Sequence, residues 1–223
     1  MPPKIDALLV PQGAEFQACQ RGWRSPAGRD RPPLIAIPAG SQPVQAFLAQ
    51  TPTLNPQQTV VLLGLGGALQ PGWAVGRIAL YRDCWVGSQR YTLSGELLTW
   101  LQTILGAETV TGLGSDRLIT QAQEKQALGK TYQAALVDME SGPVLRYFQR
   151  AAVLRIVSDD CTQDLPDLTT AFDPQGRLRP LLLAWSLARE PRKAAPLIRG
   201  SLRALPVLTR VAARLGQALG AGP

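Results

Sequence analysis

The sequence predicts a three-layer α/β/α domain with a mixed, largely parallel central sheet, followed by a helical C-terminal tail. Short apolar runs bounded by turn residues alternate with helix-compatible stretches. Several runs are rich in Val, Ile and Leu without polar alternation, which is typical of strands buried on both faces. The 223 residues, of which 45% are hydrophobic, suffice for one core without disulfides or a structural metal. In such a sheet, we expect the ligand at the carboxyl ends of the strands.

The strands are predicted from the apolar runs and the helices from the stretches between them. The predicted strands are Ile5–Val10, Leu34–Ile37, Val60–Gly64, Arg77–Tyr81, Thr109–Leu113, Ala135–Asp138 and Val153–Val157. The predicted helices are Gly13–Arg21, Pro43–Ala49, Ser94–Leu105, Gln121–Lys130 and Gly142–Arg150. The third helix is the clearest, because its leucines recur at helical spacing.

The composition changes after the turn signal at 173–176, so we expect a catalytic domain over 1–173 and a tail over 174–223. The expected tail helices are Leu181–Ala188, Ala194–Ala204 and Val207–Leu219, separated by Pro191, Pro196 and Pro206. The tail carries a net charge of +8, so the rest of the chain is nearly neutral. Helices with leucine and arginine faces suit an anionic membrane surface, and equally a solvated face or a subunit contact. Nucleic-acid binding is not expected, because Trp185 is the tail's one aromatic residue.

The chain contains no histidine. This excludes Ser-His-Asp and Cys-His nucleophiles and histidine-ligated metals, so catalysis would depend on carboxylates, backbone donors, arginines or hydroxyls. The three cysteines are far apart and form no metal-binding spacing, which indicates a reducing compartment. We find no signal segment, no apolar run long enough to span a membrane, and no metal or cofactor motif. We therefore expect a cytoplasmic protein without a cofactor.

Two candidate site segments come early in the chain. Glu15 follows the first predicted strand near a helix start, where a carboxylate also favours the helix dipole without any catalytic role. The run Gly64-Leu65-Gly66-Gly67 follows the third strand, and we interpret it as a tight turn that lets a ligand approach the backbone. It matches neither a dinucleotide fingerprint nor a Walker loop, so it is weak evidence alone.

Two further segments place carboxylates directly after apolar strands. They are Val137-Asp138-Met139-Glu140-Ser141 and Arg155-Ile156-Val157-Ser158-Asp159-Asp160. Each carboxylate could also serve only as a helix cap or helix start. Together with Glu15 they predict a convergent site, because carboxylates brought together raise one another's pKa and supply an acid near neutrality.

The ordered set of glycine run, Met-Glu-Ser and Arg-x-x-Ser-Asp resembles the purine nucleoside phosphorylase and methylthioadenosine–adenosylhomocysteine nucleosidase superfamily. The resemblance covers residues 5–165 and implies a nucleoside phosphorylase-like fold that cleaves the N-ribosidic bond of an adenine nucleoside, often as a homo-oligomer. It implies that Asp159 is the general acid at purine N7, that Met139 and Glu140 hold the ribose, and that Glu15 orients the attacking water. Ser158, Asp116 and Arg117 would lie at the base.

The segments Gly114-Ser115-Asp116-Arg117, Glu124-Lys125 and Leu154-Arg155, with the basic tail, resemble the hopanoid-associated subfamily more closely. That resemblance implies a lipid-linked substrate of the adenosylhopane type. It leaves two alternatives open: a methylthioadenosine or adenosylhomocysteine nucleosidase, and a non-catalytic member that binds a nucleoside or a membrane.

The chain departs from the superfamily pattern at three places. Leu65 stands where many relatives carry a Ser or Thr that touches phosphate or ribose, and leucine has no hydroxyl. Arg82 is the only candidate for the arginine of phosphate-dependent members. Arg117-Leu118 stands where Asp-Phe is common, so the purine-stacking aromatic residue is missing. The departures at Leu65 and Arg82 favour hydrolysis over phosphorolysis, whereas the one at Arg117-Leu118 concerns the adenine pocket.

Overall fold

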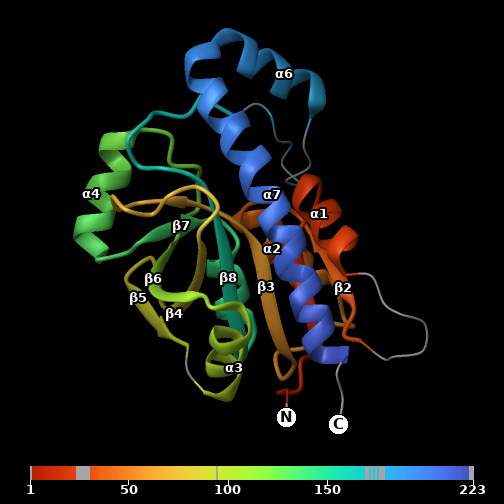
Figure 1. The fold of residues 1–223 in the computed structure, drawn as a ribbon. Helices are drawn as coiled ribbons and strands as arrows, with labels where there is room; N and C mark the ends of the chain where they lie inside the picture. Colours follow the sequence, from red (N-terminus) through yellow and green to blue (C-terminus); the bar gives the residue numbers. More distant parts are fainter. Residues whose placement is uncertain are drawn as a thin grey trace.

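The computed structural model describes residues 2–23, 31–93, 95–168, 171, 173, 175 and 179–220, apart from the side chain of Pro180 (Figure 1). The strands are β1 (Ala7–Pro11), β2 (Leu34–Ile37), β3 (Thr59–Ala68), β4 (Ile78–Val86), β5 (Gln89–Thr92), β6 (Glu108–Gly114), β7 (Leu136–Asp138) and β8 (Arg150–Asp159). The helices are α1 (Ala14–Gly22), α2 (Ser41–Gln50), α3 (Glu96–Leu105), α4 (Ala122–Tyr132), α5 (Ser141–Tyr147), α6 (Pro180–Arg189) and α7 (Pro191–Gly220).

The described strands form one mixed sheet, as predicted. Strand β8 lies parallel to β3 and antiparallel to β4; β4, β6 and β7 are then joined by parallel pairing. A short antiparallel contact between β7 and β3 closes these five strands into a ring. Strands β1 and β2 extend the sheet from β3 in parallel, and β5 pairs antiparallel with β4.

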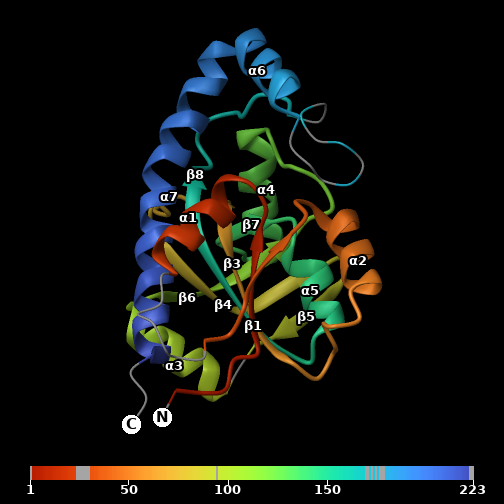
Figure 2. The same ribbon diagram turned by 90° about the vertical axis from the view of Figure 1, so that its right-hand side faces the viewer.

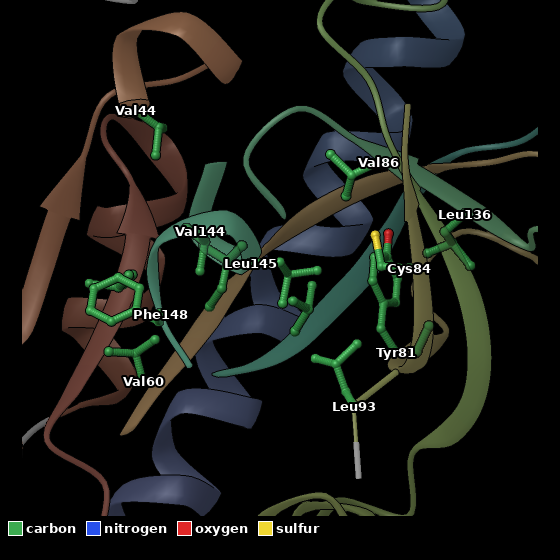
Figure 3. Close-up of a cluster of buried hydrophobic side chains, with 14 of the residues drawn as sticks. Val44, Val60, Tyr81, Cys84, Val86, Leu93, Leu136, Val144, Leu145 and Phe148 are labelled. Carbon is green, nitrogen blue, oxygen red and sulfur yellow. The ribbon is translucent and has the colours of Figure 1, made fainter. Parts of the chain in front are cut away.

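Helices cover both faces of the sheet, which confirms the three-layer prediction (Figure 2). One buried cluster joins the strands to α1, α3 and α7, and a second joins them to α2 and α5. Figure 3 shows part of the second cluster, in which Val44 of α2 and Val144 of α5 lie on the same side of the sheet as Tyr81 of β4. The three cysteines are buried and free, each within the protein interior.

The glycine run Gly64–Gly67 is not a turn, contrary to the sequence prediction. Strand β3 continues through it to Ala68, and Gly64, Gly66 and Gly67 each pair with β8. A glycine inside a strand often marks a place where another group approaches the backbone closely. The run therefore acts through its missing side chains rather than through a change of direction.

One further predicted element differs from the structure, one strand was not predicted, and one predicted helix start is not tested. The helix predicted over Gly142–Arg150 ends at Tyr147, because Arg150 already begins β8. Strand β5 was not predicted, and it is a short, exposed antiparallel partner of β4 without an apolar pattern. The predicted start of α3 at Ser94 lies outside the described residues, and the helix begins at Glu96.

The described residues of the tail form two helices rather than the three expected. Helix α7 runs from Pro191 to Gly220 through Pro196 and Pro206, although both prolines were expected to interrupt it. A proline frees the carbonyl four residues earlier, and at Pro206 that carbonyl belongs to the exposed Leu202. The predicted domain boundary includes Pro174, which lies outside the described residues, and it stays a prediction.

The second half of α7 packs into the core. Ala204, Leu208, Val211 and Leu215 are buried against α1 and the sheet. The helix can approach closely because two contact positions are glycines. A side chain at Gly22 would overlap the carbonyl oxygen of Thr209, and one at Gly200 would overlap that of Ser158. Within the described part of the chain, no helix is both long and apolar enough to cross a membrane.

Candidate functional site

A buried arginine lies at the centre of the site. Arg155 of β8 has no exposed surface, and its Nη2 donates to Asp138 Oδ1 at 2.8 Å and to Glu140 Oε2 at 3.2 Å. Burial lowers the pKa of the guanidinium, but the two carboxylates outweigh burial, so the pKa rises and the group stays charged. Among the described residues, neither Nε nor Nη1 of Arg155 has a hydrogen-bond partner.

Asp138 fixes the turn that presents the next residues. Its Oδ1 accepts from the backbone N–H groups of Glu140 at 2.9 Å and Ser141 at 2.7 Å, which caps the start of α5. Its Oδ2 accepts from the Tyr81 hydroxyl at 2.9 Å. The Tyr81 ring fits because the neighbouring strand has glycine at position 112, where a side chain would overlap the ring. Burial also raises the pKa of Tyr81 well above its ordinary value, so it remains a hydroxyl donor.

Glu15, in the first turn of α1, reaches back to β3. Its Oε2 accepts from the Leu65 N–H at 2.7 Å. Burial of this carboxylate, reinforced by the negative charge of Glu140, raises the pKa of Glu15 to about 7, against the opposing effect of Arg155. A carboxyl group with a pKa near neutrality can act as a general base or acid at physiological pH.

Gly64 leaves the space in which Glu15 and Arg155 face each other. A side chain at position 64 would overlap Arg155 Nη1, and its Cβ would lie 2.6 Å from Glu15 Oε2. The two groups are not in direct ionic contact, because no pair of their charged atoms lies within 4.0 Å. Glycine at this position therefore keeps a basic oxygen and an unpartnered N–H donor on the same side of β3.

Met139 and Glu140 lie between this centre and the loop that precedes α2. Glu140 Oε1 accepts from the Gly40 N–H at 2.9 Å, while its Oε2 accepts from Arg155. Burial raises the pKa of Glu140, although the Arg155 guanidinium opposes the shift and Asp138 adds to it. The three carboxylates of Glu15, Asp138 and Glu140 thus surround one guanidinium.

Asp159 marks the other end of the site. Its Oδ2 accepts from Lys125 Nζ of α4, its Oδ1 accepts from the Ser158 hydroxyl at 2.7 Å, and the Lys125 side chain is only 1% exposed. Gly66 and Gly67 pair with Val157 and Asp159, so Ser158 is an extra residue in β8. Such a bulge redirects the following side chain.

A small cavity adjoins Asp159. It has a volume of about 50 Å³ and is lined by Gly67, Arg117, Leu118, Ile119, Lys125, Val137, Asp138, Met139, Asp159 and Leu165. The cavity brings Met139 and Asp159 together at the same space. It is smaller than the roughly 300 to 1,000 Å³ of most small-molecule sites, so a nucleoside would enter only after the surrounding loops move.

Of the three residues predicted to lie at the base, only one lines the cavity. Arg117 lines the cavity while its guanidinium pairs with Glu124. Asp116 does not line it, because its Oδ1 accepts from the Ser41 hydroxyl at 2.7 Å and so ties the loop after β6 to α2. Ser158 supports Asp159, and its hydroxyl also lies 3.3 Å from the Gly66 carbonyl oxygen.

Arg82 does not join the site, contrary to its proposed place near the nucleophile. The adjacent Tyr81 points inward to Asp138, whereas the Arg82 side chain is 56% exposed and pairs with Asp83. Arg82 is the extra residue of a bulge in β4, because the pairing with β6 passes from Tyr81 to Asp83. Leu65 takes part through its backbone N–H, which Glu15 occupies.

Four residues of the site were absent from the predicted set: Tyr81, Lys125, Asp138 and Arg155. Asp138 and Arg155 stood inside the quoted motifs without an assigned role. A signal was available for Arg155, since one arginine within an otherwise apolar run implies a buried partner. Lys125 stood in the quoted Glu124-Lys125 segment without an assigned role, and Tyr81 gave no comparable signal.

No protein family model matches this sequence, and no curated protein sequence matches it. Solved structures do. The apo 5′-methylthioadenosine nucleosidase of Arabidopsis thaliana has a TM-score of 0.64 and 12% identity, covering 99% of this chain and 98% of that chain. A mutant Helicobacter pylori nucleosidase with 5′-methylthioadenosine in its active site has a TM-score of 0.59 and 14% identity, covering 92% and 98%. Futalosine hydrolase of the same bacterium has a TM-score of 0.57 and 11% identity, covering 88% and 96%.

The chain has the fold of these nucleosidases. The match extends over nearly the whole of each relative, so α7 belongs to the matched fold in the Arabidopsis structure as well. The similarity shows the arrangement of the sheet and helices. At identities of 11 to 14% it does not show the chemistry, which must be argued from the residues just described.

Proposed function

We propose that this chain hydrolyses the N-ribosidic bond of an adenine nucleoside. The observation that carries the proposal is that Glu15 Oε2 and the unpartnered Nη1 of Arg155 both lie beside Gly64, with no ion pair between them. A basic oxygen and a fixed donor close together are what an attacking water molecule needs for activation and orientation.

In the proposed reaction, the water oxygen bonds to the anomeric carbon of the ribose while the bond from that carbon to the purine nitrogen breaks. Glu15 accepts the proton that the water loses, and its pKa of about 7 suits this role near neutral pH. The carboxylates of Glu140 and Asp138 stabilise positive charge that develops on the sugar. Met139 and Glu140 are the proposed contacts to the ribose.

Water suits this centre better than phosphate. Three carboxylates surround a single guanidinium, so a phosphate dianion would meet repulsion from an excess of negative charge. The Leu65 N–H, a possible backbone donor to phosphate, is already bound to Glu15. Arg82, the expected phosphate-binding arginine, is exposed and paired with Asp83.

The purine is proposed to leave at the Asp159 end of the site. The hydrogen-bonded pair of Lys125 and Asp159 borders the cavity, and Lys125 Nζ donates to Asp159 Oδ2. Transfer of a proton from Lys125 by way of Asp159 to purine N7 would neutralise the leaving base and leave Lys125 uncharged. Ser158 and Arg117 are the proposed supporting groups on this side.

Within the class of adenine nucleosides, the subfamily resemblance favours a lipid-linked substrate of the adenosylhopane type. The structural relatives favour methylthioadenosine, because one of them holds that compound in its active site. Turnover of the two compounds by the same preparation separates these possibilities. Release of adenine from methylthioadenosine alone would assign the chain to the second substrate.

A second candidate function is nucleoside binding without turnover. The observations that favour it are the departures from the superfamily pattern at Leu65 and Arg117-Leu118, and the pairing of the Arg117 guanidinium with Glu124. Calorimetric binding of an adenine nucleoside without any adenine release would support this candidate and contradict hydrolysis.

The test of hydrolysis is chromatographic detection of free adenine, with and without inorganic phosphate. We expect release that does not require phosphate and that falls by about 10²- to 10⁴-fold in Glu15→Gln and in Asp159→Asn. Glu96→Gln is the matched control, because Glu96 also occupies the first turn of a helix but is exposed. Release that requires phosphate, or full activity in Glu15→Gln, would contradict the proposed nucleophile.

A further inference from the structure

Helix α6 exposes an apolar stripe that no part of the described chain covers. Leu181, Ala184, Trp185 and Ala188 recur at helical spacing, and all four are exposed. Leu181 is 85% exposed and Trp185 is 52% exposed. An amphipathic helix of a water-soluble domain normally turns its apolar stripe inward, so the outward stripe of α6 points to an external partner.

Basic side chains surround this stripe. Residues 179–203 contain six basic residues and one acidic residue, a net charge of +5. Arg189 lies over the Trp185 ring with its guanidinium carbon 4.4 Å from the ring centre, and Glu190 pairs with Lys193. The first half of α7 continues the pattern, since Ile198 and Leu202 are 44% and 67% exposed beside Arg199 and Arg203. We call α6 together with residues 191–203 the basic apolar surface.

The basic apolar surface lies at one end of the molecule, beyond the sheet (Figures 1 and 2). It is nevertheless joined closely to the candidate site. A side chain at Gly200 would overlap the carbonyl oxygen of Ser158, so α7 rests directly on the end of β8 next to Asp159. Whatever binds the surface is therefore held close to Asp159.

We propose that the basic apolar surface docks on an anionic lipid bilayer. Apolar side chains with a tryptophan suit the boundary between headgroups and acyl chains, and arginines around them attract anionic headgroups. A second copy of the chain is a poorer occupant, because a symmetric contact would oppose two surfaces of charge +5. Docking does not depend on ribosidic cleavage, although it would bring a lipid-linked nucleoside to the site.

The experiment is co-sedimentation of the full chain with vesicles. We expect binding to equimolar phosphatidylcholine and phosphatidylglycerol, little binding to phosphatidylcholine alone, and a decrease as salt is added. Leu181→Ser/Trp185→Ser tests the apolar stripe, and Arg189→Glu/Arg192→Glu tests the charge. Each pair is expected to weaken vesicle binding by at least about tenfold. Because the altered side chains are exposed, the fold should be unaffected, which circular dichroism checks.

The matched control is Arg21→Glu/Arg146→Glu, which makes the same charge change at exposed positions on α1 and α5. It should retain most of the binding, whereas an equal loss would show that only the total charge matters and would overturn the proposal. Absence of binding to anionic vesicles would also overturn it. If Leu181→Ser/Trp185→Ser instead converts a dimer to a monomer in sedimentation experiments, the surface is a contact between copies and docking on lipid is wrong. Adenine release from a water-soluble nucleoside should be unchanged in these variants, which keeps this test separate from that of hydrolysis.

Discussion

The two ends of the candidate site differ in how buried charge is balanced. At one end, one guanidinium is surrounded by the carboxylates of Glu15, Asp138 and Glu140, and two of its nitrogen atoms have no partner among the described residues. At the other end, Lys125 is bound to Asp159 and to the Asp160 carbonyl oxygen. The first end has more negative charge than positive charge, and the second end is balanced.

The difference matters because a buried cluster with an excess of negative charge favours binding of a proton or a positively charged group. Burial, reinforced by the neighbouring carboxylates, raises the pKa of Glu15 and of Glu140, while Asp159 is held by direct bonds to a cation and a hydroxyl. We therefore expect the Arg155 end to control pH dependence and much of the stability, and the Lys125 end to act mainly through local contacts.

The largest expected effect is on stability when each cation is removed. Arg155→Met would leave Asp138 and Glu140 buried without a positive charge, at a cost of about 3 to 5 kcal/mol in the free energy of unfolding. Lys125→Met should cost less, about 1 to 3 kcal/mol, because it strands only one carboxylate, at the edge of a cavity. Urea unfolding of both variants measures the difference. Equal losses would mean that the two ends are equivalent.

The second effect is a pH dependence that belongs to the Arg155 end. The pKa of Glu15 is raised from 4.5 to about 7, so between these values the folded chain holds a proton that the unfolded chain releases. The free energy of unfolding should therefore fall as pH rises through this window, by roughly 3 kcal/mol in total. If Glu15 is the base, adenine release should rise over the same window.

Unfolding measured at pH values below, within and above this window checks the sign. Glu15→Gln should remove this contribution to the pH dependence, and Asp159→Asn should retain it. An unchanged pH profile in Glu15→Gln would assign the titration to another group.

The comparison also explains what could be predicted from the sequence. The strands and the positions of Glu15, Glu140 and Asp159 follow local patterns, because apolar runs define strands and carboxylates just beyond them are conspicuous. The glycine run was misinterpreted because glycine permits both a turn and a close approach, and only the facing side chains distinguish the two. Lys125 contacts a residue 34 positions away, so its role depends on tertiary structure.

The third effect tests the space that the glycines provide. In Gly64→Ala the new methyl group would overlap Arg155 Nη1 and press on Glu15, while in Gly67→Ala its nearest neighbour would be Asp159 Oδ2 at 2.8 Å. We expect Gly64→Ala to cost about 1 to 3 kcal/mol and most of the adenine release, and Gly67→Ala to cost less. Gly66→Ala is the control, because its nearest neighbour would be a carbonyl oxygen at 3.2 Å. A ranking in which Gly66→Ala is the most damaging would contradict this account of the run.

The smallest expected effect tests whether the Tyr81 hydroxyl only supports Asp138 or takes part in the reaction. Tyr81→Phe removes the hydroxyl that donates to Asp138 Oδ2 but keeps the ring that packs over Gly112. Because Asp138 keeps its bonds to Arg155 and to the start of α5, the loss in the free energy of unfolding should be about 1 kcal/mol. Adenine release should change little, since Tyr81 reaches the proposed nucleophile only through Asp138 and Arg155. A loss of adenine release as large as that in Glu15→Gln would instead place the Tyr81 hydroxyl in the reaction. Urea unfolding of the same variant separates this role from structural support of Asp138.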